Sequence, residues 1–342
     1  MLSAVLADFS RLPNCRVVTT WDGRLGTFPD CGVEAILAHD AERERLLFEQ
    51  LARSCDASFV IAPEIDAILA NRRKRVDSAG GIFLGASREA IELCTDKLLL
   101  AKHFQANGIP TIQTKLFDRD AGSDDARFPL VLKRRDGAGS LETALIPDQN
   151  SFELARSGRL DSGHIGRMIV QPYLRGRNLS VAAIISVEQS RIDVFPIAEQ
   201  HLSGDGRFRF LGGRIPAFRH VQHNVEQLVH RACVCIPGLC GYVGFDFILP
   251  DDEPNKPLLV EINPRLTTSY LGYRALSVEN ISERIIFPAR TFPKLMWKRQ
   301  AANFQADGTV TRKDRAERSY VQQPESLVPQ SDTDHPISTT DN

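Results

Sequence analysis

The chain has 342 residues, 42% of them hydrophobic and 25% charged, and a formal net charge of −1. Its length allows two or three compact units, and its near-neutral charge provides no general basic field, so we expect no nucleic-acid partner. No apolar run approaches the roughly 18 residues of a membrane helix, and the amino terminus lacks the basic segment of a signal peptide. We therefore expect a cytoplasmic protein that does not contact a membrane.

The cysteines are odd in number and scattered, and none form a CxxC pair. This distribution argues against a disulfide framework and predicts reduced thiols. The last three lie in an apolar stretch without a matching fourth ligand, which favours packing over a zinc site. The cysteines are Cys15, Cys31, Cys55, Cys94, Cys233, Cys235 and Cys240.

The first 95 residues alternate between predicted strands and helices. Apolar runs and helical periodicity predict a helix over 1–10, strands over 15–20, 57–62 and 81–85, a helix around 40–54 and another that begins near a Ser87 cap. Such alternation is typical of a parallel sheet. We therefore predict an N-terminal α/β domain over residues 1–95.

Strands are more frequent in the remainder of the chain. The pattern predicts helices over 96–108 and 221–236 and strands over 111–117, 129–134, 168–174, 180–187, 191–197, 241–249 and 257–263. We divide this part into units over 96–175 and 176–300. From Ala306 onward the sequence is rich in Ser, Thr, Asp, Gln and Pro, so we predict that residues 301–342 form a disordered tail.

Two of these strands carry oxygen ligands. In Leu-Val-Glu-Ile-Asn-Pro-Arg (259–265), Glu261 and Asn263 lie two residues apart and share one face of the strand. Asp246 interrupts the apolar strand before it, and a buried acid is costly unless its charge is compensated. If the two strands pair across the turn at 251–256, the three side chains meet. Hard oxygen donors without His or Cys predict Mg²⁺, with Mn²⁺ as an alternative.

A lysine and a glycine-rich turn follow the strand that begins near Phe128. In Lys-Arg-Arg-Asp-Gly-Ala-Gly-Ser (133–140), Gly137 and Gly139 allow backbone N–H groups to approach phosphate oxygens, and Lys133 can neutralise phosphate charge. A solvated lysine on a surface turn is the alternative. The order of residues is not that of a Walker A loop.

The segment 169–180 is an apolar strand that stops at a proline and continues through a polar turn. Such a linker can offer backbone groups to the edge of an adenine and an apolar side chain to its face. An edge strand or a simple hinge is the alternative.

These pieces, in this order, resemble the ATP-grasp superfamily from about Cys94 to Arg274. The resemblance implies an ATP-grasp fold preceded by a pre-ATP-grasp domain, with ATP and one or two Mg²⁺ ions as cofactors. It implies Lys97 and Lys133 at the phosphates, a covering loop with Gly137, Gly139 and Ser140, an adenine hinge of Gln171, Tyr173 and Leu174, metal ligands Asp246, Glu261 and Asn263, and Arg265 at the transferred phosphoryl group or the acyl phosphate.

Two features depart from the family pattern. The hinge usually carries acids where this chain has Gln171 and Asn178, so Asn178 would bind a ribose hydroxyl without charge assistance. Either the affinity for ATP is then lower, or the ribose contact comes from another residue. The chain also begins in a predicted helix where related enzymes have a strand and a glycine loop. We therefore expect the first sheet to be incomplete.

Within the superfamily, residues 261–274 and 211–216 look most like the tyramine–glutamate ligase group of methanofuran-type cofactor synthesis. This resemblance implies that a carboxylate attacks the γ-phosphate of ATP and that an amine then displaces phosphate from the acyl phosphate. The implied partners are a small carboxylate and an amine, and a homodimer is common at this size. Candidate substrate residues are Arg214 and Arg274, against solvated surface arginines, and Thr267 and Thr268, against a cap of the next helix.

Two other functions stay open from the sequence. One is an ATP-grasp carboxylase that uses bicarbonate. The other is a non-catalytic nucleotide-binding protein, which the neutral Gln171 and Asn178 favour and which the retained acids Asp246 and Glu261 oppose.

Overall fold

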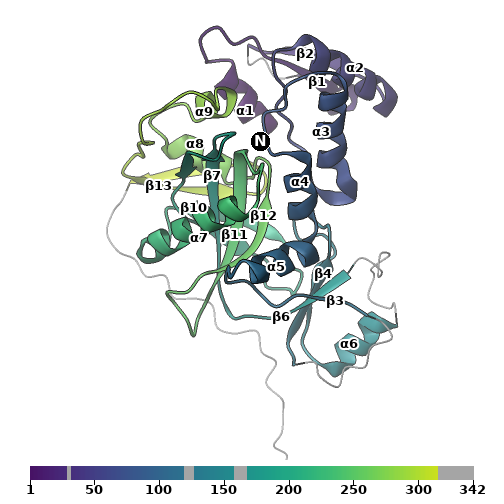
Figure 1. Ribbon diagram of the computed structural model, residues 1–342, viewed down its shortest axis with the longest axis vertical. Coiled ribbons are helices and arrows are strands. Elements are labelled where there is room, and N and C mark those ends of the chain that lie inside the picture. Colours follow the sequence, from purple (N-terminus) through teal and green to yellow (C-terminus); the bar gives the residue numbers. More distant parts are fainter. Residues whose placement is uncertain (29–31, 119–126, 158–167, 315–342) are drawn as a thin grey trace, which may run out of the picture.

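The computed structural model describes residues 1–28, 32–118, 127–157 and 168–314. They form a mixed helix and sheet structure with a two-stranded sheet, a four-stranded sheet and an eight-stranded sheet (Figure 1). The predicted α/β class is therefore confirmed. Within these ranges, no helix is long and apolar enough to cross a membrane.

The first unit contains a parallel strand pair with helices around it. β1 (Val18–Asp22) and β2 (Glu34–Ala38) pair in parallel, which confirms the predicted sheet type. The predicted strands over 57–62 and 81–85 do not form, and these segments meet at one bridge between Ser58 and Phe83. The helices are α1 (Leu2–Phe9), η1 (Gly23–Leu25), α2 (Ala41–Ser54), η2 (Ile65–Ala67), α3 (Ile68–Ser78) and α4 (Arg88–Thr95).

The segment over 57–62 stays unpaired because it packs between two cores. Phe59 and Ile61 pack against one hydrophobic cluster of the large sheet, and Val60 and Ala62 pack against the other. Its side chains therefore alternate as in a strand although most of its backbone lacks strand partners. The result is an extended chain that brings the residues after it toward the large sheet.

A small antiparallel sheet, in the order β3-β6-β4-β5, forms the second part. Along β4 buried and half-buried residues alternate, so Leu130 and Leu132 pack on the helix α6 side while Val131 and Lys133 face the opposite side. The elements are β3 (Lys115–Leu116), β4 (Leu130–Arg134), β5 (Ala144–Ile146), α6 (Gln149–Arg156) and β6 (Met168–Pro172).

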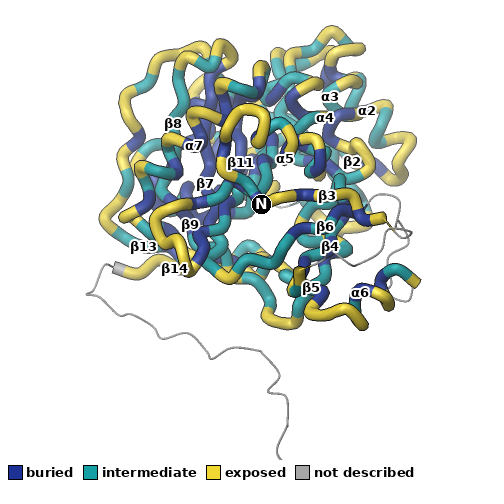
Figure 2. The backbone as a smooth tube through the Cα atoms, turned by 60° about the horizontal axis from the view of Figure 1, so that its bottom comes forward, coloured by how far each residue is buried: buried dark blue, intermediate teal, exposed yellow. Residues whose placement is uncertain are grey.

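The large sheet runs β12-β11-β7-β9-β10-β13-β14, with β8 beside β7. In β7, Val181 and Ala183 belong to one hydrophobic cluster and Ala182 and Ile184 to the other, so both faces of the sheet are covered, and Figure 2 shows the buried strands between exposed outer elements. The elements are α5 (Lys97–Ala106), β7 (Gly176–Ile185), β8 (Ile192–Val194), β9 (Ala198–Leu202), β10 (Phe210–Ile215), η4 (Arg219–Val221), α7 (Gln222–Cys235), β11 (Gly241–Pro250), β12 (Leu258–Asn263), α8 (Tyr270–Leu276), α9 (Ser282–Ile286), β13 (Gln300–Gln305) and β14 (Val310–Asp314).

The predicted start of the tail at residue 301 is wrong. β13 and β14 form an antiparallel hairpin, and β13 pairs with β10, so the sheet continues to Asp314. The inward side chains Ala302 and Phe304 are buried, but two alanines and one phenylalanine in a polar segment were too few to predict a strand. Residues 315–342 lie outside the described residues.

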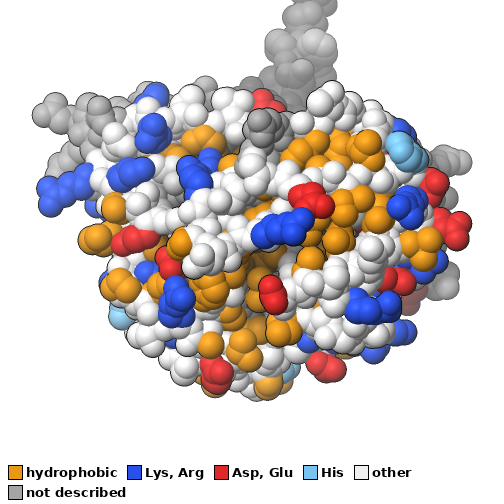
Figure 3. All heavy atoms as spheres, turned by 90° about the horizontal axis from the view of Figure 1, so that it is seen from above, with side chains coloured by type: hydrophobic (Ala, Val, Ile, Leu, Met, Phe, Trp, Pro, Cys, Tyr) orange, Lys and Arg blue, Asp and Glu red, His pale blue; other side chains and the backbone are white. Residues whose placement is uncertain are grey.

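The surface agrees with the near-neutral charge of the sequence. On the face shown in Figure 3, basic and acidic side chains are interspersed and do not gather into one basic patch.

Candidate functional site

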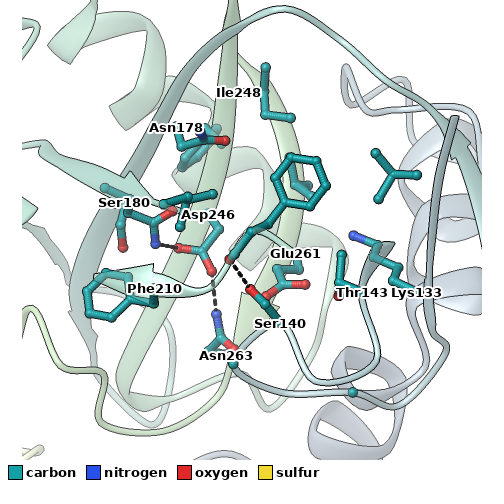
Figure 4. Close-up of a pocket in the computed structure, with 18 of the residues that line it drawn as sticks. Lys133, Ser140, Thr143, Asn178, Ser180, Phe210, Asp246, Ile248, Glu261 and Asn263 are labelled. Atoms are coloured by element: carbon teal, nitrogen blue, oxygen red, sulfur yellow. Dashed lines mark hydrogen bonds between the residues drawn. The ribbon is translucent and has the colours of Figure 1, made fainter. Parts of the chain in front are cut away.

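A cavity lies between the small sheet and the large sheet, and it gathers nearly all the predicted site residues (Figure 4). The predicted residues that line it are Lys97, Lys133, Gly137, Gly139, Ser140, Gln171, Tyr173, Leu174, Asn178, Asp246, Glu261, Asn263, Arg265, Thr267 and Thr268. Segments that are far apart in the sequence therefore converge on one place.

The floor of the cavity is the antiparallel pair β11 and β12, joined across the predicted turn. Asp246 lies directly opposite Glu261 in the register, and Asn263 lies opposite Gly244. The Asn263 amide donates a hydrogen bond to Asp246 Oδ2 at 2.9 Å. The pairing therefore brings the three oxygen-bearing side chains together, as the strand periodicity predicted.

The two acids differ in their ionisation. Burial, followed by the negative charge of Glu261, raises the pKa of Asp246 to about 7. Burial also opposes ionisation of Glu261, but Lys97 and Lys133 outweigh it and hold the pKa of Glu261 below its ordinary value. Two half-buried carboxylates that repel each other favour a bound cation between them.

Two lysines approach the acids from the other side of the cavity. Lys97 Nζ donates to the Gly137 carbonyl oxygen and lies 3.5 Å from Glu261 Oε2. Lys133 projects from the open face of β4, and burial lowers its pKa to about 8. Both cations therefore face the space that lies above the acid pair.

The glycine-rich loop covers this space. Gly139 has φ +63° and nothing lies within 4 Å of the position of an added Cβ, so its backbone is open to the cavity. Ser140 Oγ donates to the Phe208 carbonyl oxygen at 2.7 Å, which ties the end of the loop to the large sheet unit. The loop is thus anchored at its end. The Gly137 N–H donates to the Arg134 carbonyl oxygen at 3.5 Å, whereas the backbone at Gly139 stays open to the cavity, as in anion-binding turns.

The hinge at the end of β6, residues 171–174, lines another part of the cavity. The buried Gln171 amide donates to Thr114 Oγ1 at 2.8 Å, and the Tyr173 N–H donates to the Pro129 carbonyl oxygen at 3.0 Å. Val131 and Ile248 line the same end with apolar side chains, and Asn178 lies beside it. This end therefore combines apolar walls with a polar edge, which suits a flat heterocycle.

Arg265 is held at the floor by several acceptors. Its Nε donates to Glu64 Oε2 at 2.9 Å, its Nη2 lies 3.4 Å from Asn263 Oδ1, and its Nη1 donates to the Leu266 carbonyl oxygen at 3.2 Å. The guanidinium therefore sits next to the acid pair in a fixed orientation.

Two predicted substrate residues do not line the cavity. The Arg274 guanidinium forms two hydrogen bonds of 2.7 Å with Asp8 of α1, and the Tyr270 hydroxyl donates to the same carboxylate at 2.6 Å. Arg214 is exposed on β10 between two buried residues, Gly213 and Ile215. Strand alternation turns Arg214 outward, and a buried acid holds Arg274, so the structure gives neither residue a place at the site.

Two family models match the chain. The model of the ATP-grasp domain matches residues 94–269, and that of the pre ATP-grasp 3 domain matches residues 15–91. The chain belongs to the ATP-grasp family. The predicted ATP-grasp fold, with a pre-ATP-grasp domain before it, is thereby confirmed.

This ATP-grasp protein is similar to tyramine–L-glutamate ligase of Methanocaldococcus jannaschii, with 28% identity over 226 residues, which are 65% of this chain and 60% of that protein. It is also similar to D-alanine–D-alanine ligase of Anaeromyxobacter dehalogenans, with 26% identity over 60% of this chain and 70% of that protein. Among solved structures, it shares its fold with the biotin carboxylase domain dimer of Hydrogenobacter thermophilus 2-oxoglutarate carboxylase, in complex with MgADP, ADP and bicarbonate, at a TM-score of 0.70 and 13% identity over 88% of this chain and 71% of that chain.

The donor set of this ATP-grasp site fits Mg²⁺ with a nucleotide. Asp246, Glu261 and Asn263 supply oxygen atoms from two carboxylates and one amide. Within the described ranges, no cluster of three or more His, Cys, Asp or Glu side chains is placed to hold a metal ion. Mg²⁺ commonly takes one or two carboxylates and completes its shell with phosphates and waters. Mn²⁺ stays a prediction.

Several site residues were missed from the sequence. The Gln200 amide of β9 donates to Asp246 Oδ1 at 2.8 Å, and Phe210 of β10 and Phe304 of β13 line the cavity with their rings 6.3 Å apart. No strand was predicted over 198–202, 210–215 or 300–305. The apolar residues Phe210, Leu211 and Ile215 were the available signal in β10, but the adjacent glycines Gly212 and Gly213 interrupt it.

Proposed function

We propose that this protein is an ATP-dependent ligase that joins a carboxylate to an amine and forms ADP and phosphate. The convergence of two lysines, a glycine-rich loop and a half-buried acid pair on one cavity supports this proposal most strongly. Lys97 and Lys133 would bind the phosphates of ATP, and Gly137, Gly139 and Ser140 would cover them. Phosphoryl transfer needs positioning and charge neutralisation more than a covalent nucleophile.

In the first step, an oxygen of the substrate carboxylate attacks the γ-phosphorus of ATP, the bond to the β–γ bridging oxygen breaks, and ADP leaves. In the second step, the amine nitrogen attacks the acyl carbon, inorganic phosphate leaves, and the nitrogen loses a proton. Mg²⁺, held by Asp246, Glu261 and Asn263, would neutralise phosphate charge. Arg265 lies beside these residues and would stabilise the transferred phosphoryl group.

The hinge end of the cavity would hold the nucleoside. Val131 and Ile248 provide apolar walls for the adenine, and Gln171, Tyr173 and Leu174 provide its edge. Asn178 would bind the ribose. In Figure 4, Asn178 and Lys133 lie on different sides of the acid pair Asp246 and Glu261.

For the substrates, we propose glutamate as the acid and tyramine or tyrosine as the amine, in methanofuran-type cofactor biosynthesis. The similarity to tyramine–L-glutamate ligase supports this choice, although the chain spans only 60% of that protein. The aromatic end of the cavity, formed by Phe210 and Phe304, supports it independently. Aromatic rings pack well against the edges and faces of other rings.

Room for the Phe304 ring depends on two glycines. A Cβ at Gly272 would lie 2.9 Å from Phe304 Cδ1, and a Cβ at Gly213 would lie 2.7 Å from Phe304 Cζ. Thr267 and Thr268 line the cavity close by and offer hydroxyl groups for the substrate carboxylate. Small residues therefore bring an aromatic ring to the end of the cavity that the nucleotide does not need.

The test is a panel of acid and amine pairs assayed for ADP release. We expect release with glutamate plus tyramine or tyrosine, and none with either partner alone or with D-alanine as both partners. Bicarbonate-dependent release without glutamate would favour a carboxylase. No release with any pair, together with nucleotide binding, would favour a non-catalytic binding protein. A homodimer and a cytoplasmic location stay predictions.

A further inference from the structure

One turn of the first unit, residues 63–67, reaches two basic residues of the site. Glu64 Oε2 accepts a hydrogen bond from Arg265 Nε at 2.9 Å, and the two residues are 201 positions apart in the chain. Asp66 Oδ1 accepts one from Arg134 Nη2, also at 2.9 Å, across 68 positions. Two carboxylates in a single turn therefore contact the floor of the cavity and the start of its covering loop.

The Glu64 carboxylate is buried, with 5% of the residue exposed. One of its oxygens accepts from Arg265, while Oε1 has no hydrogen-bond partner within the described residues. Replacing a buried ion pair by apolar residues is often neutral or stabilising, so the pair is weak as a device for stability alone. Its clear geometric effect is to fix one edge of the Arg265 guanidinium while the other edge faces Asn263.

Asp66 contacts the covering loop through Arg134, the residue after Lys133. Arg134 is 3% exposed, and besides Asp66 it binds Asp136 Oδ1 through Nε at 3.0 Å. The Asp66 backbone N–H donates to Asp136 Oδ2 at 3.3 Å. Asp136 directly precedes Gly137, so these contacts tie the start of the glycine-rich loop to the first unit.

The backbone of this turn is itself unusual. Asp66 has φ 51° and Ala67 has φ 57°, which is the left-handed region that residues other than glycine rarely adopt. Such conformations persist where the surrounding contacts determine them, and they are frequent at functional sites. The contacts with Arg134 and Asp136 supply that constraint for Asp66.

We propose that the 63–67 turn is a positioning element of the ligase. Glu64 orients Arg265 toward the transferred phosphoryl group, and Asp66 sets the position of the glycine-rich loop through Arg134 and Asp136. Neither acid touches the reacting atoms in this scheme. The proposal rests on the proposed function, because the role of Arg265 presupposes phosphoryl transfer.

The first experiment measures binding of MgADP with and without aluminium fluoride, which mimics a phosphoryl group in transfer. In Glu64→Gln, we expect affinity for MgADP alone to stay within about 2-fold of wild type, and affinity for MgADP with aluminium fluoride to fall roughly 10-fold. In an Arg265→Met background, Glu64→Gln should change neither affinity by more than about 2-fold. A structural role alone would not produce this difference.

Three outcomes have distinct meanings. If Glu64→Gln weakens both complexes equally, or has the same effect with and without Arg265, Glu64 does not act through Arg265 and the proposal is wrong. If wild type binds MgADP but aluminium fluoride adds no affinity and no acid and amine pair releases ADP, the proposed function fails instead. Circular dichroism and the thermal midpoint check that each variant is folded.

The second experiment tests Asp66, whose side chain is 59% exposed, so that its replacement leaves folding intact. In Asp66→Asn, we expect the Kd for Mg²⁺ with the β,γ-imido analogue of ATP to rise roughly 5-fold and kcat at saturating ATP to stay within about 2-fold. The matched control is Asp77→Asn in α3, which breaks the 2.9 Å ion pair with Arg73 away from the cavity. Equal Kd values for the two variants would overturn the role of Asp66.

Discussion

Two regions of the cavity are built in different ways: the floor with the acid pair, here called the metal end, and the wall with Phe210 and Phe304, here called the aromatic end. At the metal end, Asp246 and Glu261 sit on neighbouring strands joined by one turn, and their positions follow from the alternation of side chains along those strands. At the aromatic end, Phe210 and Phe304 come from β10 and β13, which pair only because the chain returns to the sheet after α9. Local sequence therefore determines one end, and topology determines the other.

This difference separates the reaction from the choice of substrate. The residues that we propose for phosphate and metal binding lie in compact motifs that tolerate little change in spacing. The residues at the aromatic end can vary strand by strand without disturbing β11 and β12. An ATP-grasp fold can in this way keep one chemistry and accept different acids and amines.

The largest effect should come from the metal end. Asp246→Asn and Glu261→Gln each remove one charge without changing size, and we expect kcat for ADP release to fall roughly 10³-fold or more, because the phosphates lose their metal. Glu199→Gln is the control, since Glu199 is a partly buried acid on β9 that pairs with Arg177 at 3.3 Å and does not line the cavity. If either site variant keeps more than a tenth of wild-type activity, the acid that it replaces is not a metal ligand.

The second prediction concerns Asp8 of α1, which forms an ion pair with Arg274 of α8. Asp8→Asn breaks a buried ion pair, so we expect the free energy of unfolding at pH 7 to fall by about 3 kcal/mol in urea titrations. Since Arg274 has no place at the site, the KM for glutamate should stay within about 2-fold. If the KM for glutamate rises several-fold while the free energy of unfolding is unchanged, Arg274 binds the substrate.

The same pair gives a pH dependence. Burial opposes the charge of Asp8, but the hydrogen bonds from Arg274 and Tyr270 outweigh it and hold the pKa of Asp8 below its ordinary value of 3.8. A carboxylate with a lowered pKa stabilises the fold above the unfolded pKa and loses that contribution as the pH falls through the folded pKa. The stability difference between wild type and Asp8→Asn should therefore be constant from pH 7 to pH 5 and shrink below about pH 4.

The third prediction tests the aromatic end. Phe210 is half-buried, so Phe210→Leu should fold, and the lost ring contact should raise the KM for tyramine roughly 10-fold. Hydroxylamine in place of tyramine traps the acyl phosphate as a hydroxamate. The rate of hydroxamate formation should stay within about 2-fold of wild type. Phe287→Leu, after α9, is the matched control. If Phe210→Leu impairs the reaction with hydroxylamine as much as the reaction with tyramine, Phe210 acts in the first step and does not bind the amine.

The metal end was predictable from the sequence because each signal was short. An acid inside an apolar strand, and an acid and an amide two residues apart, fix Asp246, Glu261 and Asn263 once the two strands pair. Lys133 and its loop were predictable because glycines mark the turn after a strand. These residues all line one cavity, as the sequence predicted.

The rest depends on contacts that no local pattern contains. Glu64 meets Arg265 across 201 positions, and Asp8 removes Arg274 from the site across 266 positions. β13 was assigned to a tail because its polar residues hide two buried side chains, Ala302 and Phe304. Pairing partners of this kind are set by the topology of the sheet, so one sequence without its fold does not reveal them.

The smallest expected effect lies at the hinge, where Asn178 replaces the usual acid. Asn178→Asp would let a carboxylate accept the ribose hydroxyl, and charge-assisted hydrogen bonds are stronger than neutral ones, so we expect the Kd for MgADP to fall about 5-fold in calorimetry. The matched ligand is 2′,3′-dideoxy-ADP, which lacks the hydroxyls and should gain nothing from the substitution. If both nucleotides bind Asn178→Asp equally well, the ribose contact comes from another residue, and the departure at Asn178 does not weaken ATP binding.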